Sequence, residues 1–179
     1  MRASVFICVA AFALAACSPD LDWSVKRGDI QGIERALEAG ADLQAGDAHG
    51  ITPLMAAVRA GRANVAALLV ERGAQVRARD KRGFTALHYA SQNGMNDTVR
   101  LLLDRGAAVD ARAGTGSYTP LHLAIISSRD ETAMLLVDRG ASITQRTGQG
   151  HTALDIATSR NEHKLATAIE DAEARRAGR

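Results

Sequence analysis

One pattern, repeated four times at a spacing of 33 or 34 residues, limits what this chain can fold into more than any other feature. The four copies begin with a threonine, then proline or alanine, then leucine: Thr52-Pro53-Leu54, Thr85-Ala86-Leu87, Thr119-Pro120-Leu121 and Thr152-Ala153-Leu154. A glycine followed by alanine recurs in the same phase at Gly40, Gly73, Gly106 and Gly140. A fixed period of this length predicts a stack of similar units, each contacting only its neighbours.

Each unit is expected to hold two helices. The threonines are suited to capping a helix N-terminus, and Pro53 and Pro120 suit the first helical position, where no backbone donor is needed. The glycines suit the left-handed conformation that ends a second helix. Within the second helices, apolar residues recur at steps of three and four, which predicts one buried stripe: Val65, Leu68 and Leu69; Val99, Leu102 and Leu103; Ala133, Leu136 and Val137.

These motifs resemble the ankyrin repeat, a β-turn followed by two antiparallel helices, from about residue 19 to about residue 172. The resemblance implies an all-α fold, an ankyrin-repeat solenoid of about five helix-turn-helix units with β-turn fingers. We place the units near residues 19–49, 50–82, 83–116, 117–149 and 150–179. The first unit lacks the threonine motif, and the last has Asp155 where the family usually has histidine. Both departures are typical of terminal capping repeats.

The first sixteen residues predict a secretory signal peptide. Arg2 is followed by an apolar run over residues 3–16, which is shorter than the roughly 20 residues that span a bilayer. The run ends in Leu14-Ala15-Ala16-Cys17, which resembles the lipobox of bacterial lipoproteins. The resemblance implies that Cys17 is the site of lipid attachment and that 17–179 is the ankyrin-repeat domain. Ordinary cleavage at Ala13-Leu14-Ala15 is the alternative.

The residues after Cys17 bear on location. By analogy with lipoproteins of Gram-negative bacteria, Ser18 in place of aspartate favours the outer membrane, facing the periplasm. Ser18, Pro19 and Asp20 are suited to the cap, first position and first-turn acid of a helix, so the first helix is expected to begin almost at Cys17. Trp23 then either lies close to the membrane or covers the end of the core.

Charge and motif content favour a binding protein over an enzyme. The chain has 22 basic and 20 acidic residues, a formal charge of +2, which predicts no general attraction to nucleic acid. Cys8 and Cys17 both lie in the first tenth of the chain, and the sequence has no recognisable hydrolase, metalloprotease or nucleotide-binding motif. We expect no enzyme activity, no cofactor and a monomeric chain.

Two histidines, His88 and His122, occupy the same position in adjacent units. Adjacent units are spaced by about 8–10 Å, too far apart for both rings to reach one zinc ion through bonds of about 2 Å. The resemblance implies instead that they hydrogen-bond backbone groups across repeats.

The resemblance also implies that a partner protein binds the concave face formed by the turn tips and first helices. The residues we expect there are His49, Ile51, Arg59, Lys81, Arg82, Phe84, Gln92, Asn93, Tyr118, Ile126, His151 and Arg160. Four of them, Ile51, Phe84, Tyr118 and His151, directly precede the capping threonines and are expected to form a row of partly exposed side chains. The alternative is that they pack over the neighbouring turn.

Two further features of the sequence each allow two interpretations. Arg77, Arg79, Lys81 and Arg82 gather positive charge that would favour an acidic partner, or else they form only a solvated turn. The extra residue within 113–117 predicts a longer finger that contacts a partner, or a tolerated insertion. The function expected from the sequence is a membrane-anchored periplasmic protein-binding scaffold. The alternative is an envelope accessory factor that binds a small ligand or a metal.

Overall fold

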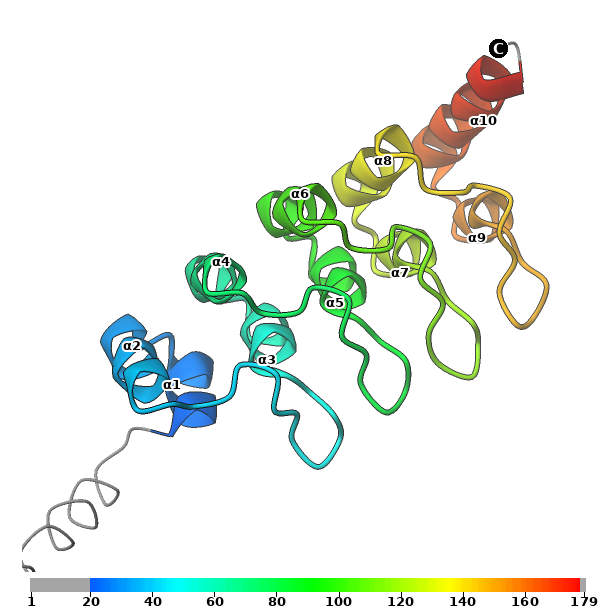
Figure 1. Cartoon of the computed structure of the whole chain (residues 1–179). Helices are drawn as coiled ribbons and strands as arrows, with labels where there is room; N and C mark the ends of the chain where they lie inside the picture. Colours follow the sequence, from blue (N-terminus) through cyan, green and yellow to red (C-terminus); the bar gives the residue numbers. More distant parts are fainter. Residues whose placement is uncertain (1–19, 178–179) are drawn as a thin grey trace, which may run out of the picture.

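A computed structural model describes residues 20–177, which form ten helices joined by turns and loops (Figure 1). The signal-peptide and lipid-attachment predictions, residues 1–16 and Cys17, lie outside the described residues. The helices pair in chain order: α1 (Leu21–Arg27) with α2 (Ile30–Glu38), α3 (Pro53–Arg59) with α4 (Ala63–Glu71), α5 (Ala86–Asn93) with α6 (Asn96–Asp104), α7 (Pro120–Ile126) with α8 (Asp130–Asp138), and α9 (Ala153–Ser159) with α10 (His163–Ala177).

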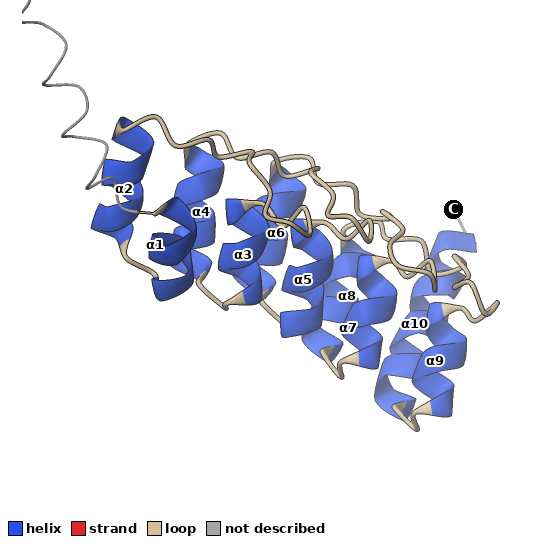
Figure 2. Cartoon of the chain, turned by 90° about the horizontal axis from the view of Figure 1, so that it is seen from below, coloured by secondary structure: helices blue, strands red, loops and turns tan. Residues whose placement is uncertain are grey.

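The pairs stack into two layers (Figure 2). The odd-numbered helices form an inner layer beside the loops, and the even-numbered helices form an outer layer. Helix α5 packs against α3, α6 and α7, so it has a neighbour on three sides. The outer helices α4, α6, α8 and α10 pack in sequence along the stack. The predicted all-α solenoid is confirmed.

Helices α3, α5, α7 and α9 begin directly after the threonines that were predicted to cap them. The side chains of Thr52, Thr119 and Thr152 accept hydrogen bonds from backbone N–H groups three residues later, and Pro53 and Pro120 follow their caps. The backbone at Gly40, Gly73, Gly106 and Gly140 has φ between 82° and 91°, as expected at the ends of the second helices. Local sequence therefore sets both ends of each pair.

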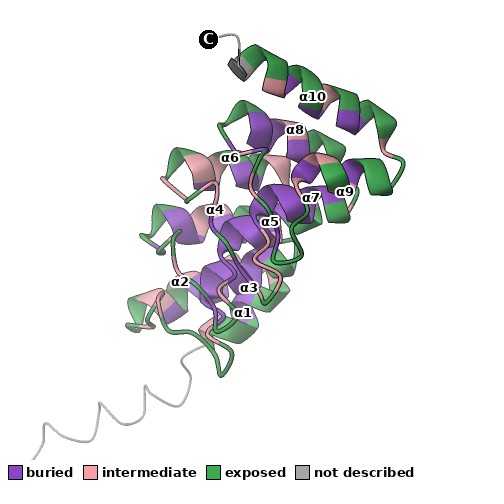
Figure 3. Cartoon of the chain, turned by 90° about the vertical axis from the view of Figure 1, so that its right-hand side faces the viewer, coloured by how far each residue is buried: buried purple, intermediate pink, exposed green. Residues whose placement is uncertain are grey.

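Two inner helices, α3 and α7, are buried along almost their whole length (Figure 3). Every residue of α7 from Pro120 to Ile125 is buried, and so is every residue of α3 from Pro53 to Val58. The alanines at one shared position, Ala57, Ala90, Ala124 and Ala157, have no exposed surface, which lets neighbouring helices approach closely. In the outer helices the buried stripe is narrower than predicted, because Leu68 and Leu103 are only half-buried.

The first helix differs from its prediction. Asp20 is the N-cap of α1, since its side chain accepts the N–H of Asp22, so its predicted place as a first-turn acid is wrong. Trp23 is 52% exposed and lies under the guanidinium of Arg27, 4.7 Å from the ring centroid. Its ring therefore does not cover the end of the core.

Two buried histidines bond backbone groups, and His88 does so across repeats, as expected. The Nδ1 atoms of His88 and His122 accept the backbone N–H groups of Thr85 and Thr119 at 3.1 and 3.2 Å. Nε2 of His88 lies 3.2 Å from the carbonyl oxygen of Tyr118 in the following repeat, and Nε2 of His122 lies 3.2 Å from the carbonyl oxygen of Gln145 in the loop after α8. Because a carbonyl only accepts, the proton is on Nε2, and both rings are neutral and fully bonded.

Burial works against protonation of these rings. Loss of solvent lowers the pKa of His88 to about 4, although the carbonyl of Tyr118 favours the charged form, and it lowers the pKa of His122 as well. A proton on Nδ1 would also break the bond from the threonine N–H. The folded state therefore holds these histidines neutral at pH values where an unfolded chain would protonate them.

This difference predicts that the free energy of unfolding falls as the pH drops from about 6.5 toward 4, since the unfolded chain binds the proton first. The lowered pKa of His88 makes the free energy of unfolding about 3 kcal/mol larger above pH 6.5 than at pH 4, and the difference is lost progressively between these two pH values. Urea titrations across this range should show a shallower pH dependence in His88→Gln than in the unchanged chain. The exposed His163→Gln is the control, and an unaltered slope in His88→Gln would contradict the prediction.

Candidate functional site

The loops between helix pairs end in turns that we call fingers, at residues 47–51, 80–84, 113–118 and 147–151. Aspartates close the first two of them. Oδ1 of Asp80 accepts the N–H groups of Arg82 and Phe84 at 2.8 Å, and Oδ1 of Asp47 accepts those of His49 and Ile51. These carboxylates satisfy backbone donors that a tight turn leaves free, so they fix the shape of the finger.

Neighbouring fingers are tied together by backbone hydrogen bonds. The N–H of Lys81 donates to the carbonyl of His49 at 2.9 Å, and the N–H of Gly114 donates to the carbonyl of Arg82 at 2.8 Å. The N–H of Gly148 donates to the carbonyl of Gly116 at 2.6 Å. The fingers therefore form one connected edge along the stack.

The finger at 113–118 absorbs the extra residue seen in the sequence. Ala113 and Tyr118 form an antiparallel bridge, each donating its N–H to the other's carbonyl at 2.9 Å. Ser117 takes a positive φ of 49° to close the longer turn. The insertion thus keeps the finger in hydrogen-bonded register with its neighbours.

The predicted row of partly exposed residues before the threonines is wrong at two positions. Ile51 and Phe84 are each only 7% exposed, whereas Tyr118 is half-buried and His151 is exposed. Phe84 packs with Ala113 and Leu123. The next finger along the stack covers its ring, so the alternative expectation, packing over the neighbouring turn, holds for Phe84.

A groove of about 730 Å³ runs from the fingers at 47–51 and 80–84 to the C-terminal ends of α3, α5 and α7. Seven of the residues expected to bind a partner line it: His49, Ile51, Arg59, Lys81, Arg82, Gln92 and Asn93. Ser127, which the sequence also places on the concave face, lines it as well, and three more residues line it that were not expected there: Asp80, Tyr89 and Arg129. The remaining expected residues, Phe84, Tyr118, Ile126, His151 and Arg160, do not line the groove.

Within the groove lining, Tyr89 donates its hydroxyl to Oδ2 of Asp80 at 2.6 Å. Burial, reinforced by this bond to a carboxylate, raises the pKa of Tyr89 to about 12, so the hydroxyl keeps its proton at physiological pH. Asp80 is 7% exposed, and both of its oxygens are occupied by the fold. The repeat period could have pointed to Asp80, because Asp47 lies 33 residues earlier at the same position of its own finger.

Four cations also line the groove: Arg59, Lys81, Arg82 and Arg129. The guanidinium of Arg59 lies 5.5 Å from the centroid of the Tyr89 ring, and that of Arg82 lies 4.7 Å from the Phe84 ring. Within residues 20–177, none of the four forms an ion pair with a carboxylate. The groove is therefore a basic surface whose positive charge the fold leaves unneutralised.

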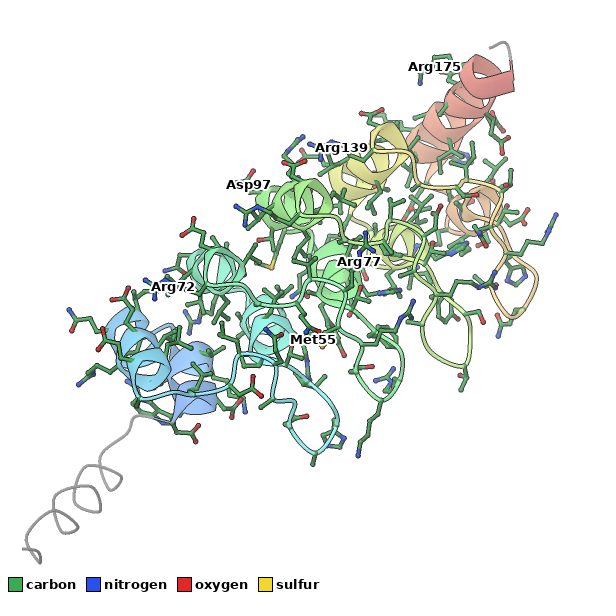
Figure 4. All side chains as sticks on the ribbon, viewed as in Figure 1. Met55, Arg72, Arg77, Asp97, Arg139 and Arg175 are labelled. Atoms are coloured by element: carbon green, nitrogen blue, oxygen red, sulfur yellow. The ribbon has the colours of Figure 1, made fainter. Side chains whose placement is uncertain are left out.

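The two other arginines of the charged segment hydrogen-bond backbone carbonyls instead of lining the groove. Arg77, labelled in Figure 4, donates Nε–H to the carbonyl of Gly106 in the next repeat at 2.6 Å. Arg79 donates to the carbonyls of Gly83 and Arg112 at 3.0 and 2.9 Å. Only Lys81 and Arg82 of the four clustered cations face the groove.

Two cations on the outer layer form ion pairs, unlike those in the groove. Arg72 and Arg139 (Figure 4) pair with Glu34 and Asp104 of the preceding repeat at 2.8 and 2.9 Å. These pairs are largely exposed, and such pairs contribute about 0–1 kcal/mol each. These two outer-layer cations are therefore partly neutralised within the stack, whereas the four groove cations are not.

Within residues 20–177 no cluster of three or more histidine, cysteine, aspartate or glutamate side chains could hold a metal ion. No helix in the described part of the chain is long and apolar enough to cross a bilayer.

Comparison with known protein families gives independent support for the fold. Residues 21–113, more than half of the chain, match a family model described as ankyrin repeats in three copies. Residues 117–148 match the model of the single ankyrin repeat. No curated protein matched the chain.

The Tyr89–Asp80 bond predicts a stability difference between two tyrosines. Tyr89→Phe should lower the free energy of unfolding by about 1–3 kcal/mol, because it leaves a buried carboxylate oxygen without its donor. Tyr118→Phe is the matched control, since the Tyr118 hydroxyl makes no hydrogen bond within the described residues. Urea unfolding of both variants measures the difference, and equal losses would show that the bond to Asp80 contributes little.

Proposed function

The chain belongs to the ankyrin-repeat family, and on that basis we propose that it is a membrane-anchored scaffold, facing the periplasm, that holds a partner protein in the basic groove. Ankyrin repeats generally serve protein–protein interaction. The proposal adds to this family role the surface that is used and the compartment in which it works.

The observation that carries the proposal is the set of exposed polar side chains in the groove whose hydrogen-bonding groups the fold does not use. Arg59, Lys81, Arg82 and Gln92 are exposed, and within residues 20–177 their side chains make no ion pair and no hydrogen bond. Elsewhere on the stack, comparable side chains such as Arg79 and Arg112 bond the backbone of the next repeat. Side chains with free donors beside a concave surface are suited to a partner.

The anchoring part of the proposal rests on the sequence before the repeats. Leu14-Ala15-Ala16-Cys17 resembles a lipobox, and α1 begins at Leu21, four residues after Cys17. A lipid on Cys17 would therefore hold the first repeat close to the bilayer, with the groove, formed by the second to fourth repeats, further out. Ser18 supports the outer membrane as the site of retention.

Site-specific photo-crosslinking in the native host tests the groove. A photo-reactive residue at Gln92 or Arg82 should give one discrete adduct identifiable by mass spectrometry, because both side chains are exposed in the groove. The control places the same residue at Arg100, which is exposed on α6 and does not line the groove. An identical diffuse set of adducts from all three positions would rule out a dedicated partner in the groove.

Metabolic labelling with a palmitate analogue tests the anchor. The unchanged chain should carry the label and sediment with membranes, because the proposed lipid is attached to the thiol of Cys17. Cys17→Ser should lose the label and appear in the soluble periplasmic fraction. Cys8→Ser is the control, since the proposed cleavage removes that cysteine. A mature chain without label that begins after Ala15 would instead establish ordinary signal cleavage.

A further inference from the structure

We infer that the groove selects an acidic peptide segment of its partner, one rich in aspartate and glutamate. This inference rests on the proposed function and names the chemistry of the partner. It follows from which charges the fold has already used and which remain available in the groove.

The balance of charge in the groove is strongly positive. Its lining contains the four cations Arg59, Lys81, Arg82 and Arg129, against one carboxylate, that of Asp80. The whole chain has a formal charge of only +2, so this excess is local. A concave surface with charge of one sign attracts a ligand of the opposite sign and raises its rate of association.

The one carboxylate does not neutralise the cations through ion pairs. Asp80 is 7% exposed, with Oδ1 accepting two backbone N–H groups and Oδ2 accepting the Tyr89 hydroxyl. All three donors lie within nine residues of Asp80 along the chain. The arginines and the lysine therefore keep donors for carboxylates that come from outside.

Two of the cations are held in place before a partner arrives. Arg59 lies over the Tyr89 ring, and Tyr89 is fixed in turn by its bond to Asp80. Arg82 lies over Phe84, which is buried beneath the next finger. Rings that position a guanidinium reduce the entropy lost when it pairs with a carboxylate, which favours binding.

The rest of the lining suits a peptide better than a lipid surface. Gln92 offers a side-chain amide that can bond peptide groups, and Ser127 offers a hydroxyl. These groups lie within a hollow of about 730 Å³, into which an extended chain fits but a flat bilayer does not. A narrow acidic segment can reach the cations and the amide together.

Selection from a random peptide library measures this preference directly. Displayed twelve-residue peptides are selected against the full-length chain in detergent, and one selected peptide is labelled for fluorescence anisotropy. The selected pool should be enriched in aspartate and glutamate, and its binding should weaken as the salt concentration rises. The double variant Arg59→Gln, Arg82→Gln should bind the labelled peptide about tenfold more weakly.

A matched variant separates groove charge from net charge. Arg100→Gln with Lys164→Gln removes the same two charges from exposed positions on α6 and α10 that do not line the groove. This variant should bind the peptide as the unchanged chain does. Urea unfolding of both double variants confirms that each is folded.

The outcomes distinguish this inference from the proposed function. A selected pool without acidic enrichment that still binds less well to the groove variant would overturn the acidic partner and leave the groove as the binding surface. Selected peptides that bind both double variants equally would overturn the groove itself. Binding to phosphatidylglycerol vesicles that only the groove variant loses, with no acidic peptides selected, would assign the groove to the membrane instead.

Discussion

No repeat in this stack can bury its own apolar face, and the rest of the structure depends on that constraint. Helix α5 lies between α3 and α7, so its leucine and alanines are covered by two other repeats. The same neighbour must also satisfy its buried polar group, since His88 finds the carbonyl of Tyr118 one repeat further on. Apolar contact and hydrogen bonding are thus supplied together by the next unit, and stability is shared along the chain.

This dependence on the neighbour also decides which side chains are available for binding. Arg77 and Arg79 bond carbonyl groups of the next repeat, and Arg112 bonds the carbonyl of Arg146 in the repeat after that. Within residues 20–177, the side chains of Lys81 and Arg82, two and three residues beyond Arg79, have no such acceptor, and both line the groove. The charged segment therefore contributes to the proposed binding surface only those cations that do not bond the next repeat.

The sequence predicted most of the fold because its signals are local and repeated. Threonine caps, proline at the first helical position and glycine after the second helix each act within a few residues. The groove was predicted only in part. Ile51 and Phe84 occupy the expected place in their units but are buried, because exposure depends on what the next finger covers. The contact of Tyr89 with Asp80, nine residues apart, depends on the path of the finger, which the repeat period does not specify.

The hydrogen bonds between fingertips connect the two fingers that line the groove to the two that do not. Each tip is joined to the next by a single backbone bond, from Lys81 to His49, from Gly114 to Arg82 and from Gly148 to Gly116. A finger pushed aside by a bound segment pulls on the tips before and after it, because these bonds are short and directional. The four fingertips are therefore linked in series, so that a displacement of one tip acts on its neighbours through these bonds.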